Sequence, residues 1–153
     1  MGGTILATPF RWNIARREQL GGLISATEPG RPLNDMFLES LRATASRILA
    51  HANRSDLAFI GRTPENLYDY LSGCFEGLRD VPSLHLVQYS LRNAGSVEQV
   101  PEPALNGLFD YLTAEGLGSR AIATGPRPIA LVDFVASGGT MEGLIRLMRL
   151  QAE

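Results

Sequence analysis

The sequence contains no lysine, and all 14 of its basic residues are arginines. A permanently cationic side chain that clamps a phosphate must therefore be a guanidinium, and chemistry that passes through a lysine Schiff base is excluded. Acidic residues number 16, which gives a formal net charge of -2. Because no basic surplus is present to neutralise a phosphate backbone, nucleic acid is not an expected partner.

Cysteine is nearly absent, and the single Cys74 cannot form a disulfide within the chain. It falls in an apolar pattern of helical spacing, which predicts a small buried side chain rather than a catalytic thiol. No apolar run approaches the ~18 residues of a membrane helix, and the first residues lack a basic segment followed by an apolar one. We expect a cytoplasmic protein with no membrane partner.

The 153 residues, of which 44% are hydrophobic and 20% charged, suit one soluble globular domain. No internal repeat or linker indicates a second domain. Residues 1–52 are expected to form an N-terminal helical part, and residues 56–150 an α/β core. The elements expected in the first part are a short strand at Thr4–Ala7, a helix at Asn13–Leu20, and a helix from Asn34 or Asp35 to about Ala52.

Apolar stretches alternate with helical patterns in the second part. This alternation predicts right-handed parallel crossovers, and hence a doubly wound, mainly parallel α/β sheet flanked by helices. The run that begins at Ile129 is typical of a strand buried on both faces. The other elements expected are strands at Asp56–Gly61, Leu84–Leu91 and Arg120–Thr124, a helix capped by Thr63 that starts at Pro64, a helix at Ala104–Glu115 ended by Gly116, and a helix through Glu142–Met148.

The loops after the three main strands are expected to meet at the carboxyl edge of the sheet, where such folds bind ligands. Ser137, Gly138, Gly139 and Thr140 can offer backbone N–H groups and hydroxyls to a phosphate, beside the positive end of a helix. Asp133 lies at the exit of the preceding strand. The other two loops are Gly61-Arg62-Thr63-Pro64, which is either a second anion site or a capped surface turn, and Arg92–Gly95.

Several other polar and aromatic residues favour structural roles. His51 is expected to interact with the last carbonyls of its helix, and His85 to be a satisfied, partly buried side chain. Phe134, Tyr89 and Trp12 are expected in the core. Of the remaining features, the Arg11, Arg16 and Arg17 cluster favours a solvated helix face over a phosphate contact, and the long Arg92–Pro103 segment is typical of a lid or binding loop.

The stretch Leu131–Met141 resembles the phosphoribosyl pyrophosphate loop of type I phosphoribosyltransferases. That loop has apolar residues, two acids, two apolar residues, a variable position, Thr, Gly, a variable position and Thr. Asp133 matches the second acid, and Ser137 takes the place of the first Thr. Gly138 and Thr140 match directly.

The resemblance implies a phosphoribosyltransferase fold that binds phosphoribosyl pyrophosphate and Mg²⁺, and transfers the phosphoribosyl group to an acceptor that the sequence does not identify. Ala136 to Thr140 would hold the ribose 5-phosphate, and Asp133 would contact the ribose hydroxyls and the metal. Gly61, Arg62 and Thr63 stand in the place of the family's pyrophosphate loop, where Arg62 would assist the leaving group. Arg92–Pro103 falls where the family has a mobile closing loop.

Three departures from the family leave alternatives open. Val132 replaces the first acid, and Ala136 occupies a position that is acidic in relatives where it assists a purine base. The chain also ends about one helix after the motif, so either residues 1–52 supply the family's hood, the fold is reduced, or the natural protein is longer. A non-catalytic nucleotide-binding or regulatory module and a Rossmann-like interaction domain are the competing interpretations, and the oligomeric state, a homodimer included, stays open.

Overall fold

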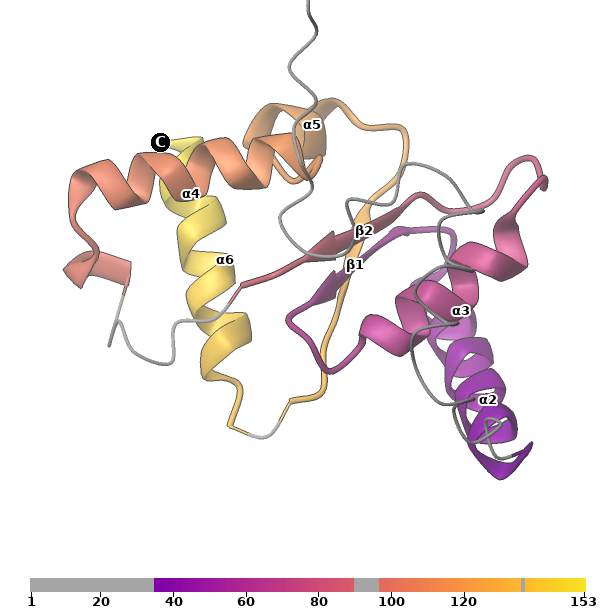
Figure 1. Cartoon of the computed structure of the whole chain (residues 1–153). Coiled ribbons are helices and arrows are strands. Elements are labelled where there is room, and N and C mark those ends of the chain that lie inside the picture. Colours follow the sequence, from indigo (N-terminus) through magenta and orange to yellow (C-terminus); the bar gives the residue numbers. More distant parts are fainter. Residues whose placement is uncertain (1–34, 90–96, 136) are drawn as a thin grey trace, which may run out of the picture. The chain divides into compact units, whose positions relative to one another are not determined.

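The computed structural model describes residues 35–89, 97–135 and 137–153 (Figure 1). The residues Glu39–Glu153 form one compact unit, which contains the sheet. The expected strand at Thr4–Ala7, the expected helix at Asn13–Leu20 and the basic cluster near Trp12 lie outside the described residues. So do Ala136 and residues 90–96.

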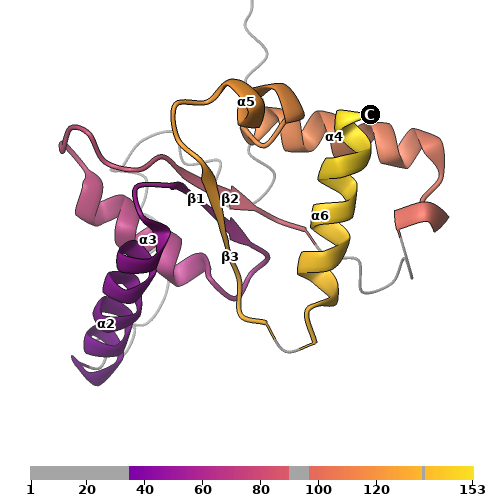
Figure 2. The same ribbon diagram turned by 180° about the vertical axis from the view of Figure 1, so that it is seen from behind.

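Three parallel strands form the sheet, in the order β2-β1-β3. They are β1 (Asp56–Ile60), β2 (Leu84–Val87) and β3 (Ile129–Val132). Figure 2 shows the same strands from the opposite side. The strand buried on both faces is therefore β1, with Leu57 to Ile60 all 0% exposed. The expectation that the run at Ile129 is buried on both faces was wrong, because β3 pairs with β1 alone among the described strands and is half-buried.

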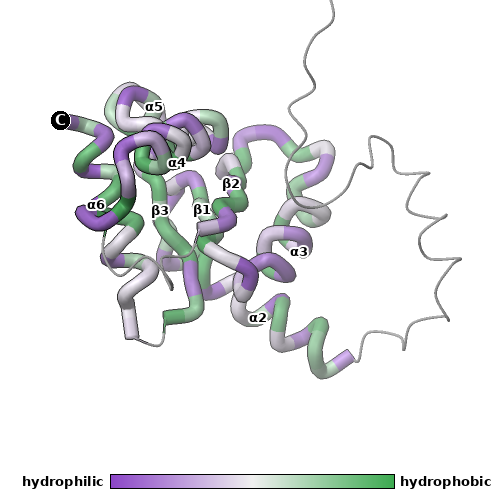
Figure 3. The backbone as a smooth tube through the Cα atoms, turned by 60° about the vertical axis from the view of Figure 1, so that its left-hand side comes forward, coloured by the Kyte–Doolittle hydropathy of each residue, from purple (hydrophilic) through white to green (hydrophobic). Residues whose placement is uncertain are grey.

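Helices cover both faces of the sheet. Leu57 and Phe59 of β1 pack with α2 (Asp35–Ala52) and α3 (Glu65–Phe75) in one apolar cluster. Ala58 and Ile60 point the other way, into a cluster with α4 (Glu102–Ala114) and α6 (Gly139–Ala152). Figure 3 draws the apolar strands between these more amphipathic helices. The coarse expectation of an α/β fold is confirmed.

The strand order creates a switch point between β1 and β3. The chain moves from β1 to its neighbour β2 through α3 on one face, and from β2 to β3 through α4 on the other. When two crossover connections have the same handedness but run across the sheet in opposite directions, their helices must lie on opposite faces of the sheet. The loops after β1 and β3 consequently diverge, and in parallel α/β sheets the crevice at such a point is the usual ligand site.

The segment Arg120–Thr124, expected as a strand, is instead part of the short helix α5 (Ser119–Thr124). Its backbone turns because the Ile122 N–H donates to the Gly118 carbonyl at 3.0 Å. Gln151 of α6 also fixes its first residue, since the Gln151 side-chain oxygen accepts the Ser119 N–H at 3.2 Å. A local backbone bond and a contact from a distant side chain thus hold this segment as a helix.

The helix expected at Ala104–Glu115 is confirmed as α4, and it ends as predicted at Gly116. Gly116 is left-handed, with φ +80. The Gly116 N–H donates to the Thr113 carbonyl at 3.1 Å, and the Leu117 N–H to the Leu112 carbonyl at 2.7 Å. This paired bonding is the Schellman arrangement, and the buried Leu112 and Leu117 supply the apolar contact that accompanies it.

Two expectations about α3 were wrong. Thr63 does not cap the helix, because Pro64 takes the cap position and no side chain bonds there. The Pro64 carbonyl instead accepts the N–H groups of Leu67 and Tyr68 at 3.0 Å. Cys74 is exposed rather than buried, because the packed side of α3 is centred on Leu71. The strand expected at Leu84–Leu91 also ends earlier, at Val87, within the described part.

Candidate functional site

The exits of β1 and β3 leave the sheet side by side. Phe59 pairs with Val132 in the parallel register. Two residues further along each strand come Gly61 and Phe134, with Asp133 just before the latter. Neighbouring strands lie about 4.8 Å apart, so the two loops start within reach of one small ligand. The structure therefore brings together two of the three loops expected at this edge, and Arg92–Gly95 lies outside the described residues.

The loop after β1 turns at Gly61. This residue has φ +76, and its N–H donates to the Val87 carbonyl of β2 at 2.7 Å. Arg62 and Thr63 are exposed, whereas Pro64 is buried. The Arg62 carbonyl accepts the Glu65 N–H at 3.2 Å. Turn carbonyls accept several amides of the first turn of α3, and the cationic side chain of this loop is the exposed Arg62.

Asp133 lies at the exit of β3 and is half-buried. Its carboxylate oxygen Oδ1 accepts the Phe134 N–H at 2.7 Å. The side chain of Phe134 is 76% exposed and that of Val135 55% exposed. The expectation that Phe134 belongs to the core was wrong, because β3 ends before it and its ring is carried out to the carboxyl edge.

The N-terminus of α6 offers unused backbone donors. Gly138 is the cap residue, with φ +84, and no side chain bonds to the helix end. The N–H groups of Gly139, Thr140 and Met141 have no hydrogen-bond partner among the described residues. A left-handed residue followed by free amides at a helix start makes a concave donor site for an anion. Ser137 beside it is exposed, and Ala136 lies outside the described residues.

The only charged side chain in the first turn of α6 is Glu142. An acid here would repel a bound phosphate, but Arg146 pairs with Glu142 through an Nη2–Oε1 contact of 2.8 Å. Arg146 also reaches Glu98 of η1 (Val97–Gln99) at 3.4 Å. Two acids and one guanidinium leave a net charge of -1 near the helix start, so the Glu142–Arg146 pair reduces the repulsion of an incoming anion without removing it.

The described residues contain no group of three His, Cys, Asp or Glu side chains that could hold a metal. The acids at the carboxyl edge include Asp133 at the exit of β3 and Glu65 and Glu142 in the first turns of α3 and α6. Mg²⁺ usually keeps several waters and binds through one or two carboxylates together with substrate phosphates. The donor set therefore fits a Mg²⁺ ion carried by a diphosphate, and does not fit a metal held by the protein alone.

Two other residues noted in the sequence serve packing. His85 is partly buried, as expected, and its Nδ1 donates to the Glu115 carbonyl at 2.7 Å. Tyr89 is 5% exposed, and its hydroxyl has no hydrogen-bond partner among the described residues. Burial raises the pKa of Tyr89 to about 12. The Tyr111 hydroxyl accepts the Gln88 N–H at 2.7 Å and so ties α4 to the end of β2.

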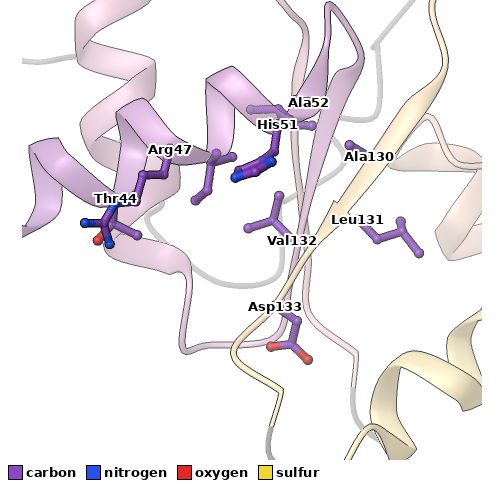
Figure 4. A pocket seen from close by; sticks show the side chains of 10 residues that line it. Thr44, Arg47, His51, Ala52, Ala130, Leu131, Val132 and Asp133 are labelled. Carbon is purple, nitrogen blue, oxygen red and sulfur yellow. The ribbon is translucent and has the colours of Figure 1, made fainter.

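A groove that the sequence did not indicate lies between α2 and β3, with a volume of about 330 Å³ (Figure 4). His51 lines it. As expected, His51 is the basic residue of the last turn of α2, although its side chain makes no hydrogen bond to the last carbonyls within the described part. No sequence signal marks the groove, because its two walls are far apart along the chain. The lining residues are Thr44, Arg47, Ile48, His51, Ala52, Leu57, Ala130, Leu131, Val132 and Asp133.

The parallel sheet, its helical cover and its open carboxyl edge define the α/β class. Comparison with protein-family models, with curated proteins and with solved structures gave no match for this chain. Across residues 35–89, 97–135 and 137–153, no helix combines the length and apolar character needed to cross a membrane. Function is therefore inferred from the geometry of the site.

Proposed function

We propose that this chain is a cytoplasmic phosphoribosyltransferase-like protein. It binds phosphoribosyl pyrophosphate with Mg²⁺ at the carboxyl edge of the sheet, and transfers the phosphoribosyl group to an acceptor. The observation that carries the proposal is the switch point between β1 and β3. The two loops that resemble the family's pyrophosphate and ribose-phosphate loops leave the sheet at this place.

Each end of the ligand has a matching group. The ribose 5-phosphate binds the free amides that follow Gly138, with the hydroxyls of Ser137 and Thr140 beside them. Asp133 accepts hydrogen bonds from the ribose hydroxyls, since its Oδ1 is held by the Phe134 N–H and its position is therefore fixed. Arg62, exposed in the loop after β1, contacts the pyrophosphate.

The reaction breaks the bond between the ribose C1 and the pyrophosphate oxygen, and forms a bond from C1 to the acceptor. Positive charge develops on the sugar as the pyrophosphate leaves with the bonding electron pair. The protein contributes by positioning both groups and by stabilising the departing negative charge through Arg62. When bound, Mg²⁺ supplies further charge neutralisation on the pyrophosphate.

A non-catalytic phosphoribosyl- or nucleotide-binding module is the second candidate. The observation in its favour is that Val132, which replaces the first acid of the motif, is half-buried and lines the groove beside α2. Among the described residues, Asp133 is not part of any group of three or more His, Cys, Asp or Glu side chains that could hold a metal. A protein that kept its phosphate donors and lost one acid would still bind the ligand.

Pyrophosphate release separates these two functions. The protein is incubated with phosphoribosyl pyrophosphate, Mg²⁺ and a panel of nucleobases and other amines. Release by the wild type and an at least 100-fold loss in Asp133→Asn are expected, with Asp110→Asn on the exposed side of α4 as a matched control that keeps full activity. Binding without release would favour the non-catalytic module, and the absence of any binding of phosphoribosyl pyrophosphate would contradict both.

A further inference from the structure

The groove between α2 and β3 has an apolar floor and polar ends. Ile48, Ala52 and Leu57 line it together with Ala130 and Val132, and all five side chains are buried or half-buried. Its volume of about 330 Å³ falls at the lower end of the range found for small-molecule sites, roughly 300–1,000 Å³. A flat apolar body of the size of one aromatic ring with substituents therefore fits this floor.

The polar side chains of the groove differ between its two walls, with Thr44, Arg47 and His51 on α2 and the acid Asp133 at the end of β3. Thr44, Arg47 and His51 come from successive turns of α2, and Figure 4 shows the His51 ring on the side of the helix that faces β3. The side chains of Arg47 and His51 make no ion pair and no hydrogen bond within the described part of the chain. The α2 wall thus offers unused donors to an acidic group.

The other wall ends at Asp133, which belongs to both the groove and the switch point. The Asp133 side chain lies past Val132 at the end of β3 (Figure 4). A ligand in the groove can therefore extend along β3 as far as Asp133, the ribose contact of the proposed site. This continuity connects the groove with the place where a phosphoribosyl group would be attached.

We infer that the groove binds a small aromatic carboxylate. Its ring packs on the apolar floor, and its carboxylate receives hydrogen bonds from Arg47 and His51. In the context of the proposed function, on which this further step rests, the groove is the acceptor site, and acidic ring compounds are the acceptors to be tested first. Binding of the aromatic carboxylate in the groove does not depend on the proposed acceptor role.

Fluorine NMR titration with 4-fluorobenzoate tests the binding, and 4-fluorobenzamide serves as the neutral probe of nearly equal shape. Saturable binding of the acid to the wild type is expected, with at least fivefold weaker binding of the amide. Arg47→Gln and His51→Gln should each weaken binding of the acid at least fivefold. Arg42→Gln is the matched control, since Arg42 lies on the same helix but does not line the groove, and it should bind as the wild type does.

Equal affinity for the acid and the amide, equal affinity of Arg47→Gln and the wild type, or no saturable binding would each overturn the groove assignment. Phosphoribosyl pyrophosphate is titrated into the same samples as a second arm. If it binds while 4-fluorobenzoate does not, the groove assignment alone fails. If 4-fluorobenzoate binds with the expected dependence on Arg47 while phosphoribosyl pyrophosphate does not bind, the proposed function and the acceptor role fail, and the carboxylate site stands.

Discussion

The Asp133 carboxylate accepts the backbone N–H of Phe134 at 2.7 Å. The carboxylate belongs to the switch point, because Asp133 directly follows Val132, which pairs with Phe59 of β1. The Phe134 ring lies outside the core, where it is 76% exposed. An acid placed by its own neighbouring amide is well suited to bind a ligand, because its orientation does not depend on a flexible partner.

The left-handed turn at Gly138 provides the first prediction. A Cβ at this position would meet only Val135 Cγ1 at 3.9 Å, so the cost of Gly138→Ala comes from the backbone, whose φ is +84. We expect the free energy of unfolding to fall by about 1 kcal/mol, and phosphoribosyl pyrophosphate to bind more weakly because the amides of α6 are re-aimed.

The control for this prediction is Gly139→Ala. Gly139 begins α6 without a left-handed φ, and a Cβ there would approach only Ser137 Oγ, at 3.9 Å. Urea denaturation should find this variant within about 0.5 kcal/mol of the wild type. Equal destabilisation by both substitutions would show that the turn at Gly138 has no special backbone requirement.

The amino edge of the sheet provides the second prediction. Asp56 Oδ1 accepts the Ser83 N–H at 2.7 Å, and Arg127 Nη1 lies 3.9 Å from the same oxygen. The contacts tie the starts of β2 and β3 to β1. Asp56→Ala should lower the free energy of unfolding by about 1–2 kcal/mol and leave ligand affinity unchanged, since the site is at the opposite edge. Denaturation together with a binding titration checks both parts, and a loss of affinity at full stability would contradict it.

The buried Tyr89 hydroxyl provides the third prediction. Its pKa is raised by burial to about 12, from 10.0 for an ordinary tyrosine. Between pH 10 and 12 the Tyr89 hydroxyl is ionised in the unfolded chain but still protonated in the folded chain. The free energy of unfolding therefore falls as pH rises through this range, on the order of 1 kcal/mol per pH unit. Tyr89→Phe should remove that part of the slope above pH 10.

At neutral pH the same variant should be more stable, by about 1 kcal/mol, because a buried hydroxyl without a partner is removed. Denaturation of both proteins between pH 7 and 12 measures the two effects in one series. If Tyr89→Phe were less stable than the wild type at pH 7, the hydroxyl would have a hydrogen-bond partner in solution, and this prediction would be contradicted. The same holds if the free energy of unfolding falls equally with pH in both proteins above pH 10.

Local patterns in the sequence predict the fold where local interactions decide it. The bounds of α2 and the left-handed end of α4 at Gly116 follow from caps and periodicity. The apolar run at Ile129 predicts a strand correctly, but its position at the edge of the sheet depends on pairing partners that the run does not encode. The first residue of α5 contacts Gln151, which lies far along the chain and could not be assigned from the local pattern.

Part of the candidate site could likewise be predicted from local sequence, and part depends on how distant segments pack. Its loops could be located from the sequence, because small polar residues after apolar strands mark the carboxyl edge of a parallel sheet. Their juxtaposition required the strand order, which places β3 beside β1. The groove and the role of His51 in it could not be predicted, since they arise from the packing of α2 against β3.

Mapping of phosphoribosyl pyrophosphate by amide NMR tests the central claim most directly. The ligand is titrated with Mg²⁺ into the ¹⁵N-labelled chain, and ribose 5-phosphate serves as the shorter probe. We expect both to shift the amides of Gly139, Thr140 and Met141, and only the pyrophosphate compound to shift those of Arg62 and Thr63 as well. Unchanged amides at both loops, or shifts confined to the amino edge around Asp56, would contradict the assignment of this site.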